Sequence, residues 1–216
     1  MNSVPASDVL RNLKCEEFEE ARALALRIGL QDSSDGVMVP VGPWILGDHN
    51  LMRKMAMWRE SSMDMFFSRF RASMSSTREY LATYSLGKPD RVLFLLETDG
   101  VFVGHAGLSN VGQGSAEIDN VIKGESADSP AFMSSALRCM INWARSSLGI
   151  KHFQLRVLST NGRAIKLYTS LGFHLVKSDS LKVRKGPAGI IHLVPCSSHE
   201  ATVSEKSNLM AYDLVN

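Results

Sequence analysis

The sequence predicts an α/β protein in which a mixed, partly antiparallel sheet is flanked by helices. Two β-rich runs lie on either side of a tight Asp99-Gly100 turn, which predicts an antiparallel hairpin. The order strand, loop, helix, strand follows over residues 116–158, and a short capped helix occupies 161–172. Strands and helices therefore alternate through most of the chain, as a layered α/β domain requires.

Length and composition suit one such domain with additions. The chain has 216 residues, of which 44% are hydrophobic and 21% charged, as in ordinary globular proteins. A net charge of +2 without a basic run does not favour a nucleic-acid partner. No apolar run approaches the roughly 20 residues that cross a bilayer, and the N-terminus lacks a signal-peptide core, so no membrane partner is expected.

Cysteine and histidine usage bears on the compartment and on metals. Cys15, Cys139 and Cys196 are odd in number and far apart, which favours reduced thiols in the cytoplasm over a disulfide framework. The six histidines show no metal-ligand spacing, so no metal cofactor is expected.

Residues 1–36 are expected to form an N-terminal extension, and residues 37–216 the main domain. Apolar residues at helical spacing predict a helix over 16–28, which could pack on the core, cover a cleft or mediate a homodimer. The apolar run 37–46 is broken by prolines and glycine, which predicts a short first strand at a sheet edge.

Two helices are expected before the hairpin. Asp48 can cap the first, whose apolar side carries Leu51, Met52, Met55 and Trp58. Ser75 or Ser76 can cap the second, which extends through Tyr84. The Met- and Phe-rich stretch between them suits core packing or, alternatively, a substrate-facing lid.

Polar residues inside the predicted strands are functional candidates. Along the strand 116–122, Glu117, Asp119 and Val121 share one face, and Ile118, Asn120 and Ile122 share the other. Buried, unpaired acids are costly, so these acids are either solvated or a catalytic or substrate-binding pair. His105, inside the second hairpin strand, is either structural or faces the substrate.

The next helix is predicted to start at Ser129-Pro130 and to end at Gly149. Its N-terminus offers free amides and a partial positive charge to an anion. After Phe173 we expect a strand through Val176, a turn at 186–189, a returning strand over 190–194, a polar mobile segment and a closing strand over 209–215.

The most specific pattern is the helix that begins at Asn161. Asn161 can cap it and Gly172 can end it, since glycine enters the left-handed conformation without a clash. Ala164 and Tyr168 share its apolar face with two leucines, and a buried tyrosine hydroxyl needs a partner. An ordinary amphipathic helix with a core tyrosine is the simpler interpretation.

This segment resembles the GNAT N-acetyltransferase family. The family pattern is an Asn, an Ala three residues on, a Tyr four further and then Leu-Gly-Phe, and it is matched by Asn161, Ala164, Tyr168, Leu171, Gly172 and Phe173. The resemblance covers roughly residues 44–215. It implies a GNAT-type twisted sheet and transfer of an acetyl group from acetyl-CoA, as co-substrate, to a primary amine. A small-molecule acceptor such as an amino sugar or its nucleotide is preferred.

The resemblance also implies roles for particular residues. Tyr168 would donate a hydrogen bond or proton to the departing thiolate, and an amide near Asn120 or Val121 would bind the oxyanion. The coenzyme would contact Asn120, Val121, Ile122, Ser129, Ala131, Phe132, Met133, Ser134, Asn161, Ala164 and Tyr168. The base would be Asp119 or Glu117, with His105 as runner-up. Arg59 or Arg69 would face a substrate phosphate, unless each forms a surface salt bridge.

One segment departs from the family pattern. The pyrophosphate loop of the family carries glycines, whereas residues 129–135 contain none and Gly124 lies too early to replace them. This departure favours an alternative, a non-catalytic acyl-CoA-binding or regulatory GNAT-like module. A protein N-terminal acetyltransferase is a further alternative.

Overall fold

The computed structural model describes residues 5–29, 36–125, 129 and 131–213. Its centre is a single sheet of ten strands in the order β1-β2-β4-β5-β6-β7-β10-β8-β9-β3. The strands are β1 (Leu26–Ile28), β2 (Gly36–Pro40), β3 (Ser68–Arg69), β4 (Val92–Thr98), β5 (Val101–Gly112), β6 (Ser115–Lys123), β7 (His152–Leu158), β8 (His174–Lys185), β9 (Ile191–Cys196) and β10 (Lys206–Asp213). Most pairs are antiparallel, but β6 and β7 are parallel. The predicted mixed α/β fold is confirmed.

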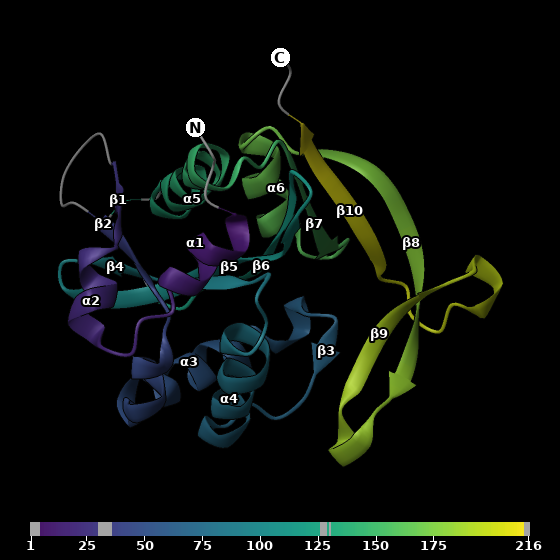
Figure 1. Cartoon of the computed structure of the whole chain (residues 1–216). Helices are drawn as coiled ribbons and strands as arrows, with labels where there is room; N and C mark the ends of the chain where they lie inside the picture. The colour runs from purple at the N-terminus through teal and green to yellow at the C-terminus, as the bar shows by residue number, and fades with distance from the viewer. Residues whose placement is uncertain (1–4, 30–35, 126–128, 130, 214–216) are drawn as a thin grey trace.

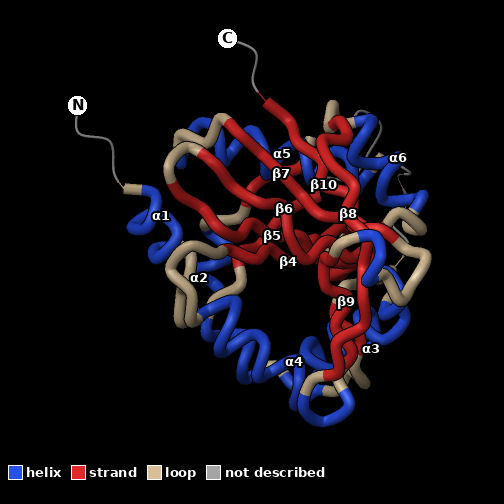
Figure 2. Tube along the Cα trace, turned by 90° about the vertical axis from the view of Figure 1, so that its right-hand side faces the viewer, coloured by secondary structure: helices blue, strands red, loops and turns tan. Residues whose placement is uncertain are grey.

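Helices cover both faces of the sheet. They are α1 (Ala6–Asn12), α2 (Phe18–Ala23), α3 (His49–Ser61), α4 (Met74–Tyr80), α5 (Phe132–Leu148) and α6 (Gly162–Ser170). In Figure 1, α5 and α6 lie above the central strands and α3 and α4 below them, and the turned view in Figure 2 agrees.

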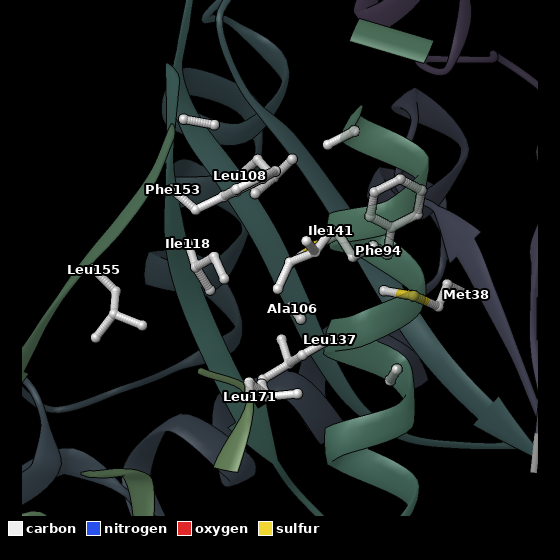
Figure 3. Packing of buried hydrophobic residues seen from close by; sticks show 14 of the residues in the cluster. Met38, Phe94, Ala106, Leu108, Ile118, Leu137, Ile141, Phe153, Leu155 and Leu171 are labelled. Carbon is white, nitrogen blue, oxygen red and sulfur yellow. The ribbon is translucent and has the colours of Figure 1, made fainter. Parts of the chain in front are cut away.

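Alternation along β4 builds a core on each side of the sheet. Val92, Phe94 and Leu96 pack toward α5, whereas Leu93 and Leu95 pack toward α3. Figure 3 shows the α5 side, where Leu137 and Ile141 of the helix pack over apolar side chains of the sheet and over Leu171, which follows α6. The labelled sheet residues are Met38, Phe94, Ala106, Leu108, Ile118, Phe153 and Leu155. With both faces buried, the central strands are fixed in register.

The parallel strands β6 and β7 separate part-way along their length. Their register pairs Ser115–Glu117 with His152–Gln154 and goes no further. From Leu155 onward β7 pairs only with β10, while the second half of β6 pairs only with β5. One edge of β6 therefore has no neighbouring strand beyond Glu117.

The C-terminal strands differ from their predicted lengths and order. β8 extends to Lys185, nine residues beyond the expected end, and forms a long hairpin with β9 that projects from the sheet in Figure 1. Within the segment expected to be polar and mobile, Ser198–Glu200 forms a helical turn, and β10 starts at Lys206. β10 inserts between β7 and β8, because its apolar residues find partners on both sides.

The N-terminal region also differs. The helix expected over 16–28 ends at Ala23, and Leu26–Ile28 instead forms the edge strand β1. The run 37–46 holds β2, which β1 and β4 flank, so the expectation of an edge strand there was wrong. Pro40 is accommodated because it is the last residue of β2.

The two helices before the hairpin are set by their caps. Asp48 caps α3 as predicted, with its carboxylate accepting from the Leu51 amide at 2.9 Å. The cap of α4 is Ser73 and not Ser75 or Ser76, because Ser73 and Ser76 form a reciprocal capping box. After Tyr80 the helix continues as a π-helical segment, Leu81–Leu86.

Candidate functional site

A bulge in β6 is the centre of the site. Asn120 has φ of +55°, a left-handed conformation that is uncommon for a residue other than glycine. The pairing of β6 with β5 shifts register at this point, between His105 and Gly107. As a result the strict alternation expected for 116–122 fails: Asp119 and Asn120, predicted on opposite faces, both line the same pocket. Backbone strain of this kind is concentrated at functional sites.

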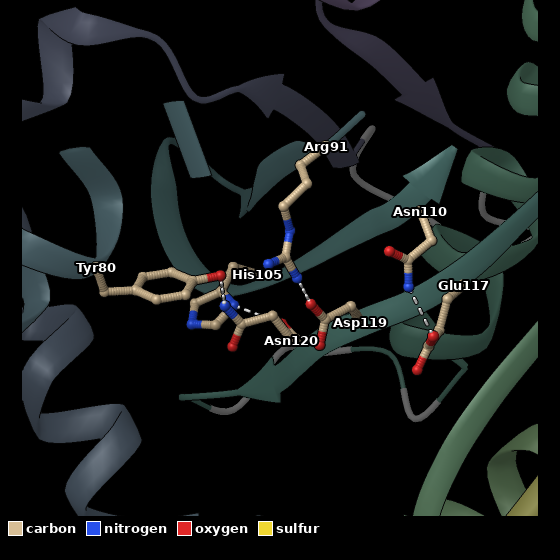
Figure 4. Close-up of polar contacts among 7 residues, drawn as sticks. All are labelled: Tyr80, Arg91, His105, Asn110, Glu117, Asp119 and Asn120. Carbon is tan, nitrogen blue, oxygen red and sulfur yellow. Dashed lines mark hydrogen bonds and ion pairs between the residues drawn. The ribbon is translucent and has the colours of Figure 1, made fainter. Parts of the chain in front are cut away.

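Two buried side chains hold Asn120 in place (Figure 4). The Asn120 side-chain amide donates to the Tyr80 hydroxyl, and the Asn120 carbonyl oxygen lies 2.7 Å from Nδ1 of His105. Because a carbonyl only accepts, Nδ1 of His105 must carry a proton. The pKa of His105 is lowered to about 4, mainly by burial and to a smaller extent by the nearby charge of Arg59, so the imidazole is neutral at neutral pH.

The two acids of β6 have different partners. Asp119 forms an ion pair with Arg91, whereas Glu117 accepts from the Asn110 side chain at 3.0 Å. In Figure 4 Asp119 lies beside Asn120, and Glu117 lies further along the strand. Asp119 lines the pocket and Glu117 does not. The predicted pair is therefore split between two environments.

The pocket lies between the sheet and the helices α3 and α4, and it has a volume of about 540 Å³. Its floor is the β6 bulge, and its walls come from α3, α4 and the C-terminal hairpin. Its lining consists of Met55, Arg59, Phe66, Phe67, Ser68, Phe70, Ser76, Thr77, Tyr80, Tyr84, Arg91, His105, Asp119, Asn120, Ile122, Ile190 and His192. The strand β3 brings the hairpin here by pairing Ser68 with His192.

Two arginines were predicted to face a substrate phosphate, and only one of them, Arg59, lines the pocket; Arg69 does not. The Arg59 guanidinium carbon lies 3.4 Å from the Phe66 ring centroid and 5.4 Å from that of Phe70. Its Nη2 donates to the Ser68 carbonyl at 2.9 Å, and burial lowers its pKa to about 10. Among the described residues no carboxylate pairs with Arg59, whereas Arg69 pairs with Glu205 at 3.3 Å and lies outside the pocket lining.

The helix α6 has the capping predicted for it. Asn161 Oδ1 accepts from the Ala164 amide at 3.1 Å, and Gly172 has φ of +98°. Tyr168 is 8% exposed and packs edge-on against Phe173 in the α5-side core, outside the pocket lining. Burial raises the pKa of Tyr168 to about 12. Within the described part of the chain its hydroxyl has no hydrogen-bond partner, and it is not among the fully buried atoms that lack one, so the ring is buried while the hydroxyl stays accessible.

The start of α5 is displaced from its predicted position. The helix begins at Phe132, with Ala131 as its cap, and not at Ser129-Pro130; Pro130 lies outside the described residues. Ser129 Oγ accepts from the Ala131 amide at 3.3 Å, and the Phe132 amide donates to the Ser129 carbonyl at 3.1 Å. The Phe132 side chain is 1% exposed in the core, and Met133 is also buried. Ser134, also predicted to contact the coenzyme, is half-buried, and its hydroxyl donates to the Ala131 carbonyl at 2.7 Å.

Gly124 packs against an indole. A Cβ at this position would lie 2.2 Å from the Trp58 ring, so only glycine fits between the end of β6 and α3. The one glycine close to the predicted anion-binding loop thus has a packing role.

Sequence reasoning missed several pocket residues. Tyr80, Arg91 and His192 were not singled out, and His192 Nδ1 lies 3.0 Å from Ser68 Oγ. Tyr80 and Arg91 come from ordinary-looking helix and strand ends. His192 lies 124 residues from its partner, so no local pattern could indicate it.

Across the part of the chain that the structure describes, no group of three or more His, Cys, Asp or Glu side chains is arranged to hold a metal ion. None of the described helices is both long and apolar enough to cross a membrane.

Comparison with known proteins places these features in a family. The family model described as the acetyltransferase (GNAT) family matches residues 55–173. No curated protein matches the sequence.

Many solved structures resemble the chain. A probable GNAT-family acetyltransferase from Chromobacterium violaceum superposes with a TM-score of 0.64 at 14% identity, covering 87% of this chain and 86% of that one. Spermidine N-acetyltransferase from Vibrio cholerae, in complex with CoA and spermine, gives 0.57 at 14%, covering 77% and 90%. The Salmonella typhimurium acetyltransferase that modifies the N-terminal serine of ribosomal protein L7/L12 gives 0.56 at 12%, covering 88% and 99%. At these identities the likeness concerns the fold.

Proposed function

Because the chain belongs to the GNAT acetyltransferase family, we propose that it transfers an acetyl group from acetyl-CoA to the primary amine of a small molecule. The observation that carries this proposal is the Tyr168 hydroxyl, which has no partner among the described residues and remains accessible at the end of a buried ring. A hydroxyl that the protein leaves unpaired and accessible is available to a ligand.

The separation of β6 from β7 supports a coenzyme site. Beyond Glu117 the free edge of β6 offers backbone groups to an extended ligand, as an additional strand would use them. Asn120, Val121 and Ile122 lie along this edge, and Asn161, Ala164 and Tyr168 come from α6, which follows β7. We propose that these two groups of residues hold the pantetheine arm.

The pyrophosphate is assigned to the start of α5. Backbone atoms of Ala131, Met133 and Ser134, together with the Ser129 hydroxyl, are the candidate contacts, since a helix N-terminus attracts anions. Phe132 fits this role less well, because its side chain is buried and its amide already donates to Ser129.

The reaction requires the amine nitrogen to attack the thioester carbon and the carbon–sulfur bond to break, with its electron pair going to sulfur. A thiol has a pKa near 8.5 and Tyr168 one of about 12, so complete proton transfer to the thiolate is uphill by about 5 kcal/mol. Tyr168 therefore acts by donating a hydrogen bond to the sulfur as charge develops. The amide of Asn120 or Val121 is the proposed oxyanion donor.

The base that takes the ammonium proton is proposed to be Asp119, directly or through water. Asp119 lines the pocket beside the bulge, whereas Glu117 lies outside it. His105 suits this role poorly, because it is 3% exposed and its Nδ1–H is already donated to the Asn120 carbonyl. We propose that His105 positions the Asn120 carbonyl.

The acceptor is proposed to be a small amine, such as an amino sugar or its nucleotide, because the site is a concave pocket of about 540 Å³ with Arg59 and His105 in its lining. We assign the activity to residues 37–216 and regard 1–36 as the N-terminal extension. A reducing compartment such as the cytoplasm suits the three cysteines, which are free thiols in the structure.

Thermal unfolding with acetyl-CoA tests the proposal, with free CoA and ATP as comparisons. At about 100 times its dissociation constant, a ligand of the native state adds roughly 2.7 kcal/mol. For a chain of this size the midpoint should rise by roughly 5 to 11 °C. A rise with acetyl-CoA but not ATP, followed by thiol release on addition of amines, is the expected result. No rise at millimolar acetyl-CoA would refute the proposal and favour the non-catalytic module.

A further inference from the structure

Arg59 is a cation in the pocket lining whose charge is not neutralised by any carboxylate of the described residues. Three charged side chains line the pocket, Arg59, Arg91 and Asp119. Since Arg91 and Asp119 form an ion pair, the lining carries one net positive charge, that of Arg59, with the histidines counted as neutral. A guanidinium removed from water without a counter-ion is costly unless something else compensates it.

The surroundings of Arg59 stabilise the cation only in part. The faces of Phe66 and Phe70 contribute cation–π attraction, and the Ser68 carbonyl accepts one hydrogen bond. A guanidinium has five N–H donors, and this bond is the only one that Arg59 makes to the described residues. None of its nitrogens is among the buried atoms without a partner, so the other donors are open to the pocket.

These contacts also fix the orientation of Arg59. Stacking on Phe66 and the bond to Ser68 leave the planar group little freedom, so the ordering cost of binding is already met by the protein. A fixed guanidinium fork matches two oxygens of a carboxylate or phosphate group. Arg59 lines the same pocket as Asp119 and Asn120 of the bulge.

We propose that the acceptor amine carries an anionic oxygen group, a carboxylate or a phosphate, which binds Arg59 while the amine lies at the Asp119–Asn120 end of the pocket. This inference rests on the proposed acetyltransferase function. The acceptor is then zwitterionic, with its ammonium toward Asp119 and its anion toward the unpaired cation. The apolar lining between the two ends accommodates the body of the molecule.

The same charge distribution disfavours polyamines. A polyamine would bring several positive charges into a pocket that already has a positive excess, and like charges in a poorly hydrated site repel strongly. This chain should therefore differ from its structural neighbour that binds spermine.

Matched pairs of acceptors test the inference. Phenylalanine and phenethylamine differ by a carboxylate, and glucosamine 6-phosphate and glucosamine differ by a phosphate. We expect the anionic member of at least one pair to have the higher kcat/KM, by roughly 10- to 100-fold, the usual range for a hydrogen bond to a charged group. The pair that shows the preference identifies the anion as carboxylate or phosphate. Spermidine should be a poor acceptor.

Variants of Arg59 connect the preference to this side chain. Arg59→Gln should bring the ratio within the pair close to 1, and Arg59→Lys should keep part of it. Arg53→Gln is the matched control, because Arg53 is an exposed arginine on the same helix that contacts Asn50. A ratio measured within one variant does not change when the variant merely folds less well.

A binding measurement separates this inference from the proposed function. Millimolar phenylacetate or inorganic phosphate should raise the unfolding midpoint of the unaltered chain and not that of Arg59→Gln, whether or not transfer occurs. Absence of any Arg59-dependent stabilisation, or equal use of the amines with and without the anionic group in both pairs, would overturn the inference while leaving acetyl transfer intact. If the anions raise the unfolding midpoint and acetyl-CoA does not, the acetyltransferase proposal is refuted and only the anion site is supported.

Discussion

The two halves of the proposed site are built in different ways. The coenzyme half comes from one continuous stretch, β6 to α6, within the part of the chain that matches the GNAT family. The acceptor half draws on α3, α4, the β6 bulge and the C-terminal hairpin, and two of its residues, Ile190 and His192, lie beyond the family match. The first half would set the reaction, and the second would select the substrate.

This difference indicates where relatives should agree and where they should diverge. A contiguous unit has its geometry fixed by its own turns and caps, so the same chemistry can be retained in distant members. An assembled pocket changes whenever one of its distant segments changes. Variants in the coenzyme half should therefore change kcat or the dissociation constant of acetyl-CoA, whereas variants in the acceptor half should change the KM of the acceptor.

The largest effect is expected in the coenzyme half, at Tyr168. Tyr168→Phe removes the hydroxyl and keeps the ring packed against Phe173. Since the hydroxyl stabilises charge that appears on sulfur only in the transition state, kcat should fall by about 10²- to 10⁴-fold with little change in the acceptor KM. Steady-state kinetics with a saturating acceptor provides the measurement.

Tyr212→Phe is the control for this experiment. Tyr212 also packs against Phe173, with ring centroids 5.5 Å apart, so its variant makes the same chemical change next to the same ring. Equal losses of kcat in the two variants would mean that Tyr168 only packs, and the simple amphipathic-helix interpretation would then be correct.

The second prediction concerns His105 in the acceptor half, and the quantity measured is the free energy of unfolding. The pKa of His105 is about 4 in the folded chain, whereas an unfolded histidine has about 6.5. Above pH 6.5 neither state binds this proton. As the pH falls toward 4, only the unfolded state takes it up, so the folded state should lose up to about 3 kcal/mol.

His105→Gln tests this prediction, because glutamine can still donate to the Asn120 carbonyl but does not titrate. Urea unfolding between pH 7 and pH 4.5 should show a shallower loss of stability in the variant. The pH profile of kcat/KM should keep its shape if His105 only positions the bulge. Loss of the acidic limb, the rise of kcat/KM with increasing pH, in the variant would instead make His105 the base.

The difference between the two halves also explains which features could be predicted from the sequence. The caps Asn161 and Asp48, the Asp99-Gly100 turn and the ends at Gly149 and Gly172 were predicted correctly, because each depends on residues within a turn of one another. Local chemistry determines such features, and the family pattern around Tyr168 consists of them.

The start of α5 and the cap of α4 were misplaced by a few residues, but most errors arose where residues distant in the sequence determine the structure. The positive φ of Asn120 moved Asp119 and Asn120 to one pocket, and no spacing rule indicates such a bulge. Residues 26–28 became a strand because β2 was available as a partner, although their pattern continued a helix. His192 reaches the pocket only because β9 pairs with β3. The acceptor half was therefore the part that the sequence described least.

The smallest effects should come from removing one helix cap in each half. Asn161→Ala removes the acceptor for the Ala164 amide, and Ser73→Ala removes the capping box of α4; each should cost about 1 kcal/mol of stability. Their kinetic effects should separate. Asn161→Ala should raise the dissociation constant of acetyl-CoA several-fold and leave the acceptor KM unchanged. Ser73→Ala loosens the helix that carries Tyr80, so it should raise the acceptor KM and leave coenzyme binding unchanged.

Ser197→Ala provides the reference for the cap pair, because it breaks a similar capping box, at Ser198–Glu200 in the loop after β9. It should lower stability without changing either binding constant. Equilibrium titration with acetyl-CoA and acceptor saturation curves, measured on all three variants, give the comparison. If both site caps shift both constants together, the halves are coupled through the Asn120 bulge, which is bonded to Tyr80 on one side and borders the open edge of β6 on the other. The bulge would then be the element through which one substrate affects the binding of the other.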